Sequence, residues 1–282
     1  FWLKNYWVLI FGSLISPFTK VLVSYYLDRR LIVPKINFKK AKLILNFSIF
    51  MLFSRLILIS SQNLPRLVIG KILGLTSAGG FKLSEQLGYF VNNILKKFTS
   101  LIVLPYFSKS FREDKIQSTE LASEFLSIIL LIILPITILA SLTSEGLIIL
   151  LFGVKWLFIK KMLIYMLIYG ALVTLSNSIF TLIVAFGKPS TETKVRLVSF
   201  LTMCSFMFFD NSLDGILLSI IMSGIVMMIL SILNLIRLKL INFKFFLKLF
   251  LLDNFPLIGI LIGYYFLRDY YNSELINFFV IN

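Results

Sequence analysis

Long apolar runs are the feature that most constrains this chain. A helix needs about 20 apolar residues to cross the roughly 30 Å hydrocarbon core of a membrane. Composition agrees, because 59% of the residues are hydrophobic and only 15% are charged, whereas soluble domains are about 25% charged. We therefore predict an all-α polytopic transmembrane helix bundle with about eight spans, at roughly 6–27, 43–69, 83–107, 125–151, 162–186, 193–209, 215–236 and 249–267.

Basic residues favour one set of alternate loops. Sixteen Lys and Arg residues lie in the segments 28–42, 108–124, 187–196 and 237–248, whereas seven lie in the segments on the opposite side. Cytoplasmic loops of membrane proteins carry an excess of Lys and Arg. The pattern predicts that segment 28–42 is cytoplasmic and that the first span runs from outside to inside. The net charge of +15 therefore reflects membrane topology, and we expect no nucleic-acid partner.

The composition also excludes several kinds of chemistry. The chain has no histidine and one cysteine, Cys204, so intrachain disulfides, Cys/His zinc sites and a histidine base are excluded. No glycine-rich loop followed by Lys-Ser/Thr is present, so ATP hydrolysis is not indicated. Among the spans, the acids Glu85, Glu145 and Asp253 have no like partner at helical spacing. We therefore expect that the protein is not an enzyme and has no metal or cofactor.

The second and third predicted spans each carry one polar face. An ionisable residue inside a span faces a bundle interior or a wet cavity, because exposing it to hydrocarbon costs roughly 2.5–3.5 kcal/mol. In the second span the residues within about 40° of one another are Ser48, Arg55, Gln62 and Arg66. In the third, those within about 40° of Lys96 are Glu85, Tyr89, Asn92 and Ser100. The matched faces predict a shared aqueous groove.

Simpler interpretations of these residues stay open at this point. Arg55 could form a structural ion pair with Glu85, and Arg66 could snorkel to the outer interface. Lys97 lies about 100° from Lys96 and could also snorkel. Glu145, near the end of the fourth span, is interpreted as an interfacial residue.

Five short motifs occur in one order along residues 5–240, and together they resemble a known family. The chain is similar to the C-terminal half of the bacterial polysaccharide and O-antigen flippases, the Wzx-like oligosaccharide exporters of the multidrug/oligosaccharidyl-lipid/polysaccharide exporter superfamily. The most specific motif is Leu-Phe-Gly-Val-Lys-Trp at 151–156, which follows a span with an internal proline, Pro135. The others lie at 68–74, 78–84, 104–109 and 185–189.

The resemblance implies a domain arrangement. Residues 1–27 would be the last span of a first lobe, 28–42 a basic cytoplasmic interlobe linker, 43–236 the second-lobe helix bundle, and 237–282 a C-terminal extension. Since the chain opens on Phe1-Trp2, we expect a piece of a longer protein or a truncated reading frame. The missing N-terminal lobe would be one partner, and other polysaccharide-assembly proteins could be further ones.

The resemblance also implies a function, which is export of a polyprenyl-diphosphate-linked oligosaccharide across the bacterial inner membrane for surface polysaccharide biosynthesis. Membrane lipids and the lipid-linked oligosaccharide are the expected partners, and no cofactor is implied. The lobes would rock around a central cavity. The candidate substrate-binding residues are Arg55, Gln62, Arg66, Tyr89, Asn92, Lys96, Lys97 and Asn177.

Three alternatives remain. A drug or small-cation exporter of the same fold would need acidic residues in its cavity. A membrane glycan polymerase would need a large external loop. A non-functional remnant is the third, because one lobe alone cannot alternate access.

Overall fold

The computed structural model describes residues 7–27, 38–113 and 115–241, and within these residues all regular structure is helical. The chain separates into two units, Phe1–Asn46 and Phe47–Asn282. The first unit contains α1 (Trp7–Leu27) and the first turns of α2 (Phe38–Gly88). The second unit contains the rest of α2, followed by α3 (Phe90–Phe98), the π-helix η1 (Thr99–Val103), α4 (Leu104–Glu113), α5 (Lys115–Leu142), α6 (Ser144–Phe152), the 3₁₀ helix η2 (Val154–Ile159), α7 (Lys160–Ala185), α8 (Pro189–Phe209) and α9 (Leu213–Arg237).

These helices confirm the predicted all-α membrane bundle. Within the described residues, four helices are long and apolar enough to cross a membrane, namely Ser48–Gly88, Gln117–Leu142, Val154–Ala185 and Leu213–Arg237. The predicted spans at 6–27 and 193–209 coincide with α1 and α8. The predicted span at 249–267, most of the extension 237–282 and residues 28–37 of the interlobe linker lie outside the described residues.

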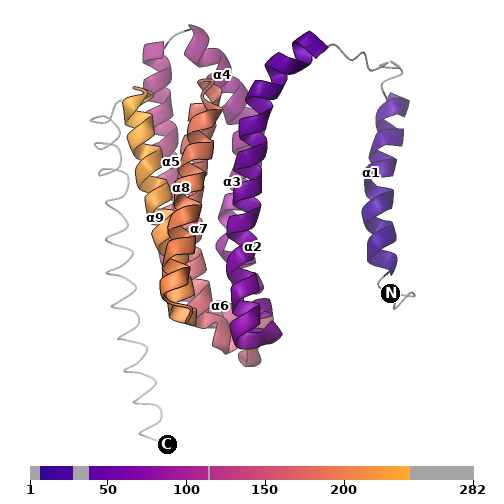
Figure 1. Ribbon diagram of the computed structural model, residues 1–282, viewed down its shortest axis with the longest axis vertical. Coiled ribbons are helices and arrows are strands. Elements are labelled where there is room, and N and C mark those ends of the chain that lie inside the picture. The colour runs from indigo at the N-terminus through magenta and orange to yellow at the C-terminus, as the bar shows by residue number, and fades with distance from the viewer. Residues whose placement is uncertain (1–6, 28–37, 114, 242–282) are drawn as a thin grey trace, which may run out of the picture. The chain divides into compact units, whose positions relative to one another are not determined.

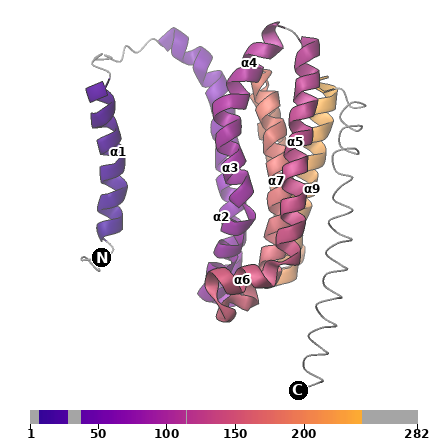
Figure 2. The same cartoon turned by 180° about the vertical axis from the view of Figure 1, so that it is seen from behind.

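Helix α7 is the centre of the second unit. It packs against α3, α4, α5, α6, α8 and α9, and both views of the ribbon show it among the helices of this group (Figures 1 and 2). Most of its side chains are buried, among them Met166, Ile179 and Ile183. By contrast, α2 and α5 expose large apolar side chains such as Leu52, Leu56 and Ile128. This is the pattern of a bundle whose outer faces meet lipid.

Two glycines allow the end of α2 to approach α7 closely. A Cβ atom added to Gly170 would collide with the backbone carbonyl of Gly88, and one added to Gly88 would collide with the carbonyl of Met166. Small residues at helix crossings let backbones of membrane helices pack at short range. This crossing fixes the end of α2 against the central helix.

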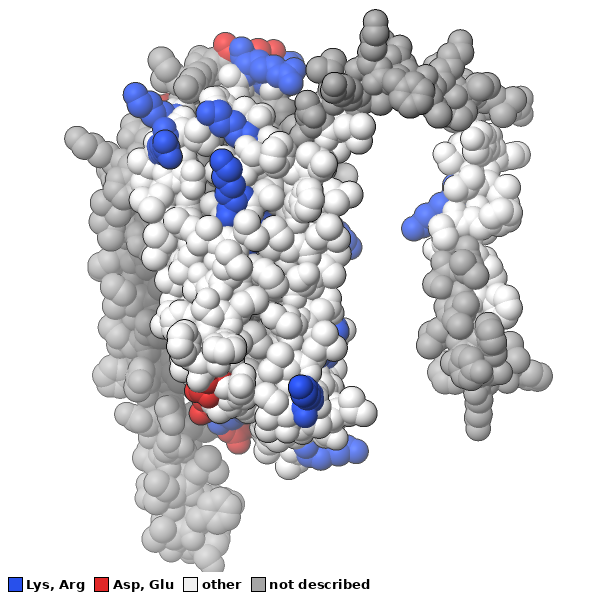
Figure 3. Space-filling model, in the orientation of Figure 1, with Lys and Arg blue, Asp and Glu red and all other residues white. Residues whose placement is uncertain are grey.

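On the face of the second unit that Figure 3 shows, most charged side chains lie toward the two ends. In the space-filling view they leave the middle of the visible face largely free of charge (Figure 3). At the end formed by α6 and the starts of α7 and α9, Lys160 pairs with Glu145 at 2.6 Å and Lys161 pairs with Asp214 at 2.5 Å. The hydrogen bond from Lys160 and its positive charge lower the pKa of the Glu145 carboxyl. These ion pairs tie α6 and α9 to the first turn of α7.

The second and third predicted spans differ from regular helices. Helix α2 turns at Gly74, which has φ 85° and ψ 170°. The backbone is locally distorted at Tyr89, which has φ −89° and ψ 1°, but the hydrogen bonds from Tyr89 to Glu85 and from Asn93 to Tyr89 keep their helical spacing. The π-helix η1 then precedes Pro105, which has no backbone N–H to donate and whose ring would clash with the carbonyl of Leu101 in a regular α-helix. The third predicted span is therefore divided among the end of α2, α3, η1 and α4.

The residues of the predicted polar face around Lys96 belong to two groups in the structure. Glu85 and Lys96 are eleven residues apart, about 16 Å along a helix axis, so Glu85 joins a different group of residues from Lys96, as described below. Asn92 and Ser100 stay close to Lys96 because no break separates Asn92 from it and Ser100 follows within one turn.

Candidate functional site

A polar cavity of about 260 Å³ lies between α2, α3, α7 and α8, with η1 and α4 at its border. The π-helix contributes Thr99 and Ser100 to the wall, and π turns recur at functional sites in helices. The complete lining is Met51, Arg55, Lys96, Thr99, Ser100, Leu104, Asn177, Phe180, Thr181, Val184, Glu192 and Arg196.

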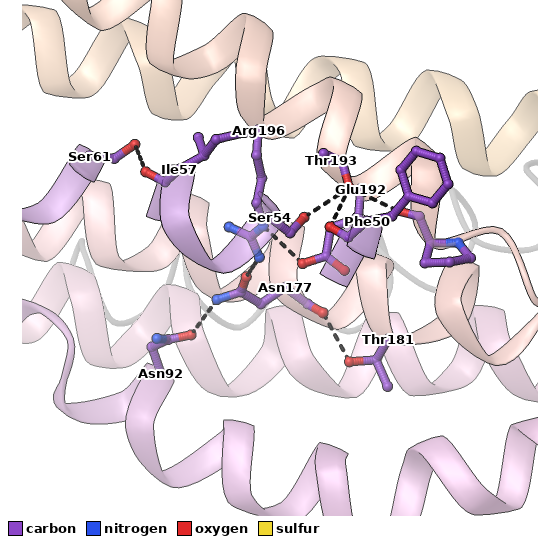
Figure 4. A network of polar contacts seen from close by, with 11 residues as sticks. Phe50, Ser54, Ile57, Ser61, Asn92, Asn177, Thr181, Glu192, Thr193 and Arg196 are labelled. Carbon is purple, nitrogen blue, oxygen red and sulfur yellow. Dashed lines mark hydrogen bonds and ion pairs between the residues drawn. The ribbon is translucent and has the colours of Figure 1, made fainter. Parts of the chain in front are cut away.

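Arg196 is held rigidly in the wall of this cavity. Its side chain is 6% exposed and donates a hydrogen bond from Nε to Oε1 of Glu192 at 2.9 Å. A second donor, NH2, bonds Oδ1 of Asn177 at 2.7 Å. The guanidinium also lies over the ring of Phe180, 4.8 Å from its centroid, in the geometry of a cation–π contact. Figure 4 shows this side chain reaching from α8 toward Asn177.

The network continues from Asn177 to other helices. The Asn177 amide Nδ2 donates to Oδ1 of Asn92 at 3.0 Å, which links α7 to α3 (Figure 4). On the other side, the Thr193 hydroxyl donates to the carbonyl of Phe50 at 2.8 Å, and Ser54 donates to Thr193 at 3.4 Å. Helices α2, α3, α7 and α8 are thus joined by polar contacts around one cavity.

Arg55 and Lys96 differ from Arg196 because they are free to bind a ligand. Both line the cavity and both are exposed. Among the residues that the structure describes, neither makes an ion pair or a hydrogen bond with another side chain. Two cations beside one polar cavity repel each other, and a low-dielectric surrounding strengthens that repulsion.

The cavity therefore suits an anion. Three cationic side chains line it against one carboxylate, and that carboxylate, Glu192, is already engaged by Arg196. An anionic group entering the cavity would relieve the repulsion between Arg55 and Lys96 and accept charge-assisted hydrogen bonds from them. The Asn177 side chain and the hydroxyls of Thr99, Ser100 and Thr181 offer polar contacts to neutral parts of the same ligand.

The structure brings together only part of the predicted site. Arg55, Lys96 and Asn177 line the polar cavity, and Asn92 lies behind Asn177. Gln62 and Tyr89 instead line a separate cavity of about 10 Å³. Lys97 is exposed and lines neither cavity.

The suggested pair of Arg55 with Glu85 is wrong. Oε2 of Glu85 accepts from NH2 of Arg66 at 2.7 Å and from Nζ of Lys82 at 2.9 Å. The turn at Gly74 is the reason, because it folds the second half of α2 back beside the first and brings Glu85 level with Arg66. Arg66 is therefore paired within the bundle, in place of the suggested snorkelling.

The sequence interpretation missed Arg196 and Glu192. Arg196 was assigned to a basic loop, whereas α8 begins at Pro189 and places both residues in its first two turns. The signal was their spacing, since an acid and a base four residues apart face each other on a helix. A carboxylate in the first turn is also favoured by the helix dipole.

Comparison with known proteins shows the family of the chain. A family model described as "Polysaccharide biosynthesis protein" matches residues 1–162. The chain belongs to this family. Similar proteins include "Lipopolysaccharide biosynthesis protein WzxC" of Escherichia coli (strain K12), 25% identical over 190 residues, and an "Uncharacterized membrane protein in cps region" of Klebsiella pneumoniae, 22% identical over 215 residues. These matches confirm the resemblance to polysaccharide flippases, and they support a membrane location and a role in polysaccharide biosynthesis.

The chain spans less than half the length of these curated relatives. The match covers 67% of this chain and 38% of the Escherichia coli protein, and 75% of this chain and 44% of the Klebsiella pneumoniae protein. The activity of these longer proteins therefore enters only as a proposal for this chain.

Proposed function

We propose that this chain forms part of a flippase that exports a polyprenyl-diphosphate-linked oligosaccharide across the bacterial inner membrane. The observation that carries the proposal is the pair of free cations, Arg55 and Lys96, beside a polar cavity in the bundle. Membership of a polysaccharide biosynthesis family supports the glycan as cargo.

Different residues of the cavity bind different parts of the ligand. Arg55 and Lys96 bind the diphosphate, which carries the negative charge, and the Asn177 side chain meets sugar hydroxyls. Asn92 orients Asn177 through the 3.0 Å hydrogen bond. Arg196 donates to the amide oxygen of Asn177 and is itself held by Glu192. This pair contributes little net charge, because the two groups neutralise each other.

The cavity does not favour the alternative of cation export. A cationic drug needs an unpaired carboxylate, and the one acid among the described lining residues, Glu192, is occupied by Arg196. As part of a flippase, the chain would act by rocking of two lobes around the ligand, with a first lobe, on the same or a separate chain, on the other side of the ligand.

The first experiment replaces Arg55 by alanine in the full-length protein of the native host. We expect surface polysaccharide to be lost while immunoblots show normal amounts of the protein in the membrane. Lys194→Ala is the matched control, since Lys194 is an exposed cation on α8 that does not line the cavity. Normal surface polysaccharide in the Arg55→Ala strain would remove the basis of the proposal.

A further inference from the structure

A second group of charges lies further along α2 and has the composition of a phosphate site. The Glu85 carboxylate receives hydrogen bonds from both Arg66 and Lys82. The carboxylate is 6% exposed, whereas the Arg66 and Lys82 side chains are 29% and 41% exposed. The two cations are therefore accessible in front of a buried anion, and together the three groups carry one net positive charge.

One donor of this group has no acceptor. Within the described part of the chain, Nε of Arg66 is buried and makes no hydrogen bond. Buried donors are satisfied in the great majority of cases, so an unsatisfied one calls for an explanation. Pro65, its neighbour in the chain, and Glu85, its partner, line the cavity of about 10 Å³, which is the size of one water molecule. A water there would satisfy the buried Nε, so a headgroup would meet the exposed remainder of the Arg66 side chain and the Lys82 ammonium.

This group shares a helix face with the polar cavity. Arg55 and Arg66 are eleven residues apart on α2, before the turn at Gly74. At 100° and 1.5 Å per residue they lie within about 20° of one another and about 16 Å apart along the axis. Gln62 lies on the same face between them. The first half of α2 thus presents two cationic positions in line.

The two positions should bind an anion with different affinities. At Arg55 the cations are unpaired, so a phosphate binds without competition. At Arg66 the buried Glu85 carboxylate already satisfies the same donors, so a phosphate must share or displace that bond. An anion is consequently held more weakly at the second position than at the first.

We propose that Arg66 and Lys82 form a second binding site for a phosphate-bearing headgroup, and that Glu85 weakens this site so that the headgroup is released. The proposal rests on the proposed function, because it makes the Arg55 and Lys96 cavity the first site and this group the second. The ligand chemistry is a phosphate or diphosphate monoester or diester.

The test separates the two sites by silencing the first. The full-length protein carrying Arg55→Gln and Lys96→Gln is purified in detergent, and binding of farnesyl diphosphate is measured by calorimetry. We expect weak residual binding. Adding Glu85→Gln should raise the affinity about tenfold, because it removes the competing charge. Adding Arg66→Gln or Lys82→Gln should abolish the residual binding, and Lys71→Gln, an exposed cation on α2, should not change it.

Each outcome decides a different question. If Glu85→Gln leaves a folded protein whose affinity is unchanged or lower, Glu85 is a structural partner only and the second site is rejected. If Glu85→Gln does not fold, Lys82→Gln decides instead, because it leaves the Arg66–Glu85 pair intact; unchanged residual binding rejects the site. Inorganic diphosphate, used as a second probe, binds equally well if the ligand is soluble and poorly if it is a lipid headgroup. A double Arg55/Lys96 variant that binds like wild type would instead reject the proposed function.

Discussion

At the scale of single residues, the cavity contains two kinds of cation. Arg196 is buried, paired and stacked on Phe180, so its role is to hold α7 and α8 in register. Arg55 and Lys96 are exposed to the cavity and unpaired within the described residues. The first kind should matter for stability, and the second for ligand binding.

Replacing Glu192 by glutamine tests the first role. The change leaves the buried guanidinium of Arg196 without its counter-charge, and breaking a buried pair in this way costs about 3–5 kcal/mol. We expect a clear fall in the midpoint of thermal unfolding in detergent, with no such fall for the exposed Lys194→Ala. The double variant Glu192→Gln/Arg196→Met should recover stability, because it removes both charges. A single Glu192→Gln variant as stable as wild type would show that the pair is not needed.

The sequence predicted part of this site for a physical reason. Arg55 and Lys96 could be predicted as site residues because a charged side chain within an apolar span is stable only in a cavity or beside a partner. Arg196 could not be predicted in this way, because it lies near the end of an apolar run. At that position the local sequence does not distinguish a cation in a loop from a buried cation in a helix. Gln62 and Tyr89 were grouped with the cavity because helical periodicity gives the face of a residue but not its distance along the bundle.

At the scale of helices, the departures from regular geometry decide which residues meet. The predicted span 125–151 is two helices, α5 and α6, separated at Thr143, which has φ −97° and ψ 15°. The turn at Gly74 brings Arg66 to Glu85, whereas eleven residues of helix separate Glu85 from Lys96. Hydrophobic runs predicted the helices, whereas a glycine within such a run does not show by itself whether the helix continues or turns there, as it does at Gly74.

The close crossing of α2 and α7 predicts that any side chain at position 170 destabilises the bundle. A Cβ there would collide with the backbone of Gly88, and backbone cannot move aside as a side chain can. We expect Gly170→Ala to destabilise the bundle by about 1–3 kcal/mol or more, seen as less folded protein in size-exclusion chromatography. Gly79→Ala is the control, because a Cβ on Gly79 meets no atom within 4 Å. Equal yields of the two variants would contradict the close crossing.

Replacing Gly74 should reduce stability through backbone strain alone. Its φ of 85° is unfavourable for any residue with a side chain, although a Cβ there would meet nothing within 4 Å. Gly74→Ala should therefore cost about 1–3 kcal/mol through conformational strain. Thermal unfolding measures the cost, again against Gly79→Ala. A midpoint equal to that of the control would mean that α2 does not need this turn.

At the scale of the whole molecule, the loop charges predict the orientation of the bundle. The basic segment 108–124 should be cytoplasmic, and η2 should face outside. In the full-length protein with Cys204→Ser, single cysteines at Lys109 and Lys155 report the two sides. An impermeant maleimide should label Lys155→Cys in intact cells and Lys109→Cys only after the membrane is opened. The reverse pattern would invert the assignment of the two sides.

The central claim is that Arg55 and Lys96 bind the anionic headgroup of a lipid that crosses the membrane. The most direct test reconstitutes the full-length protein in vesicles and measures how fast a polyprenyl-diphosphate-linked oligosaccharide moves between leaflets. We predict that Arg55→Gln/Lys96→Gln reduces this rate to that of protein-free vesicles, while Lys194→Ala keeps the wild-type rate. A double variant that moves the lipid as fast as wild type would contradict the claim.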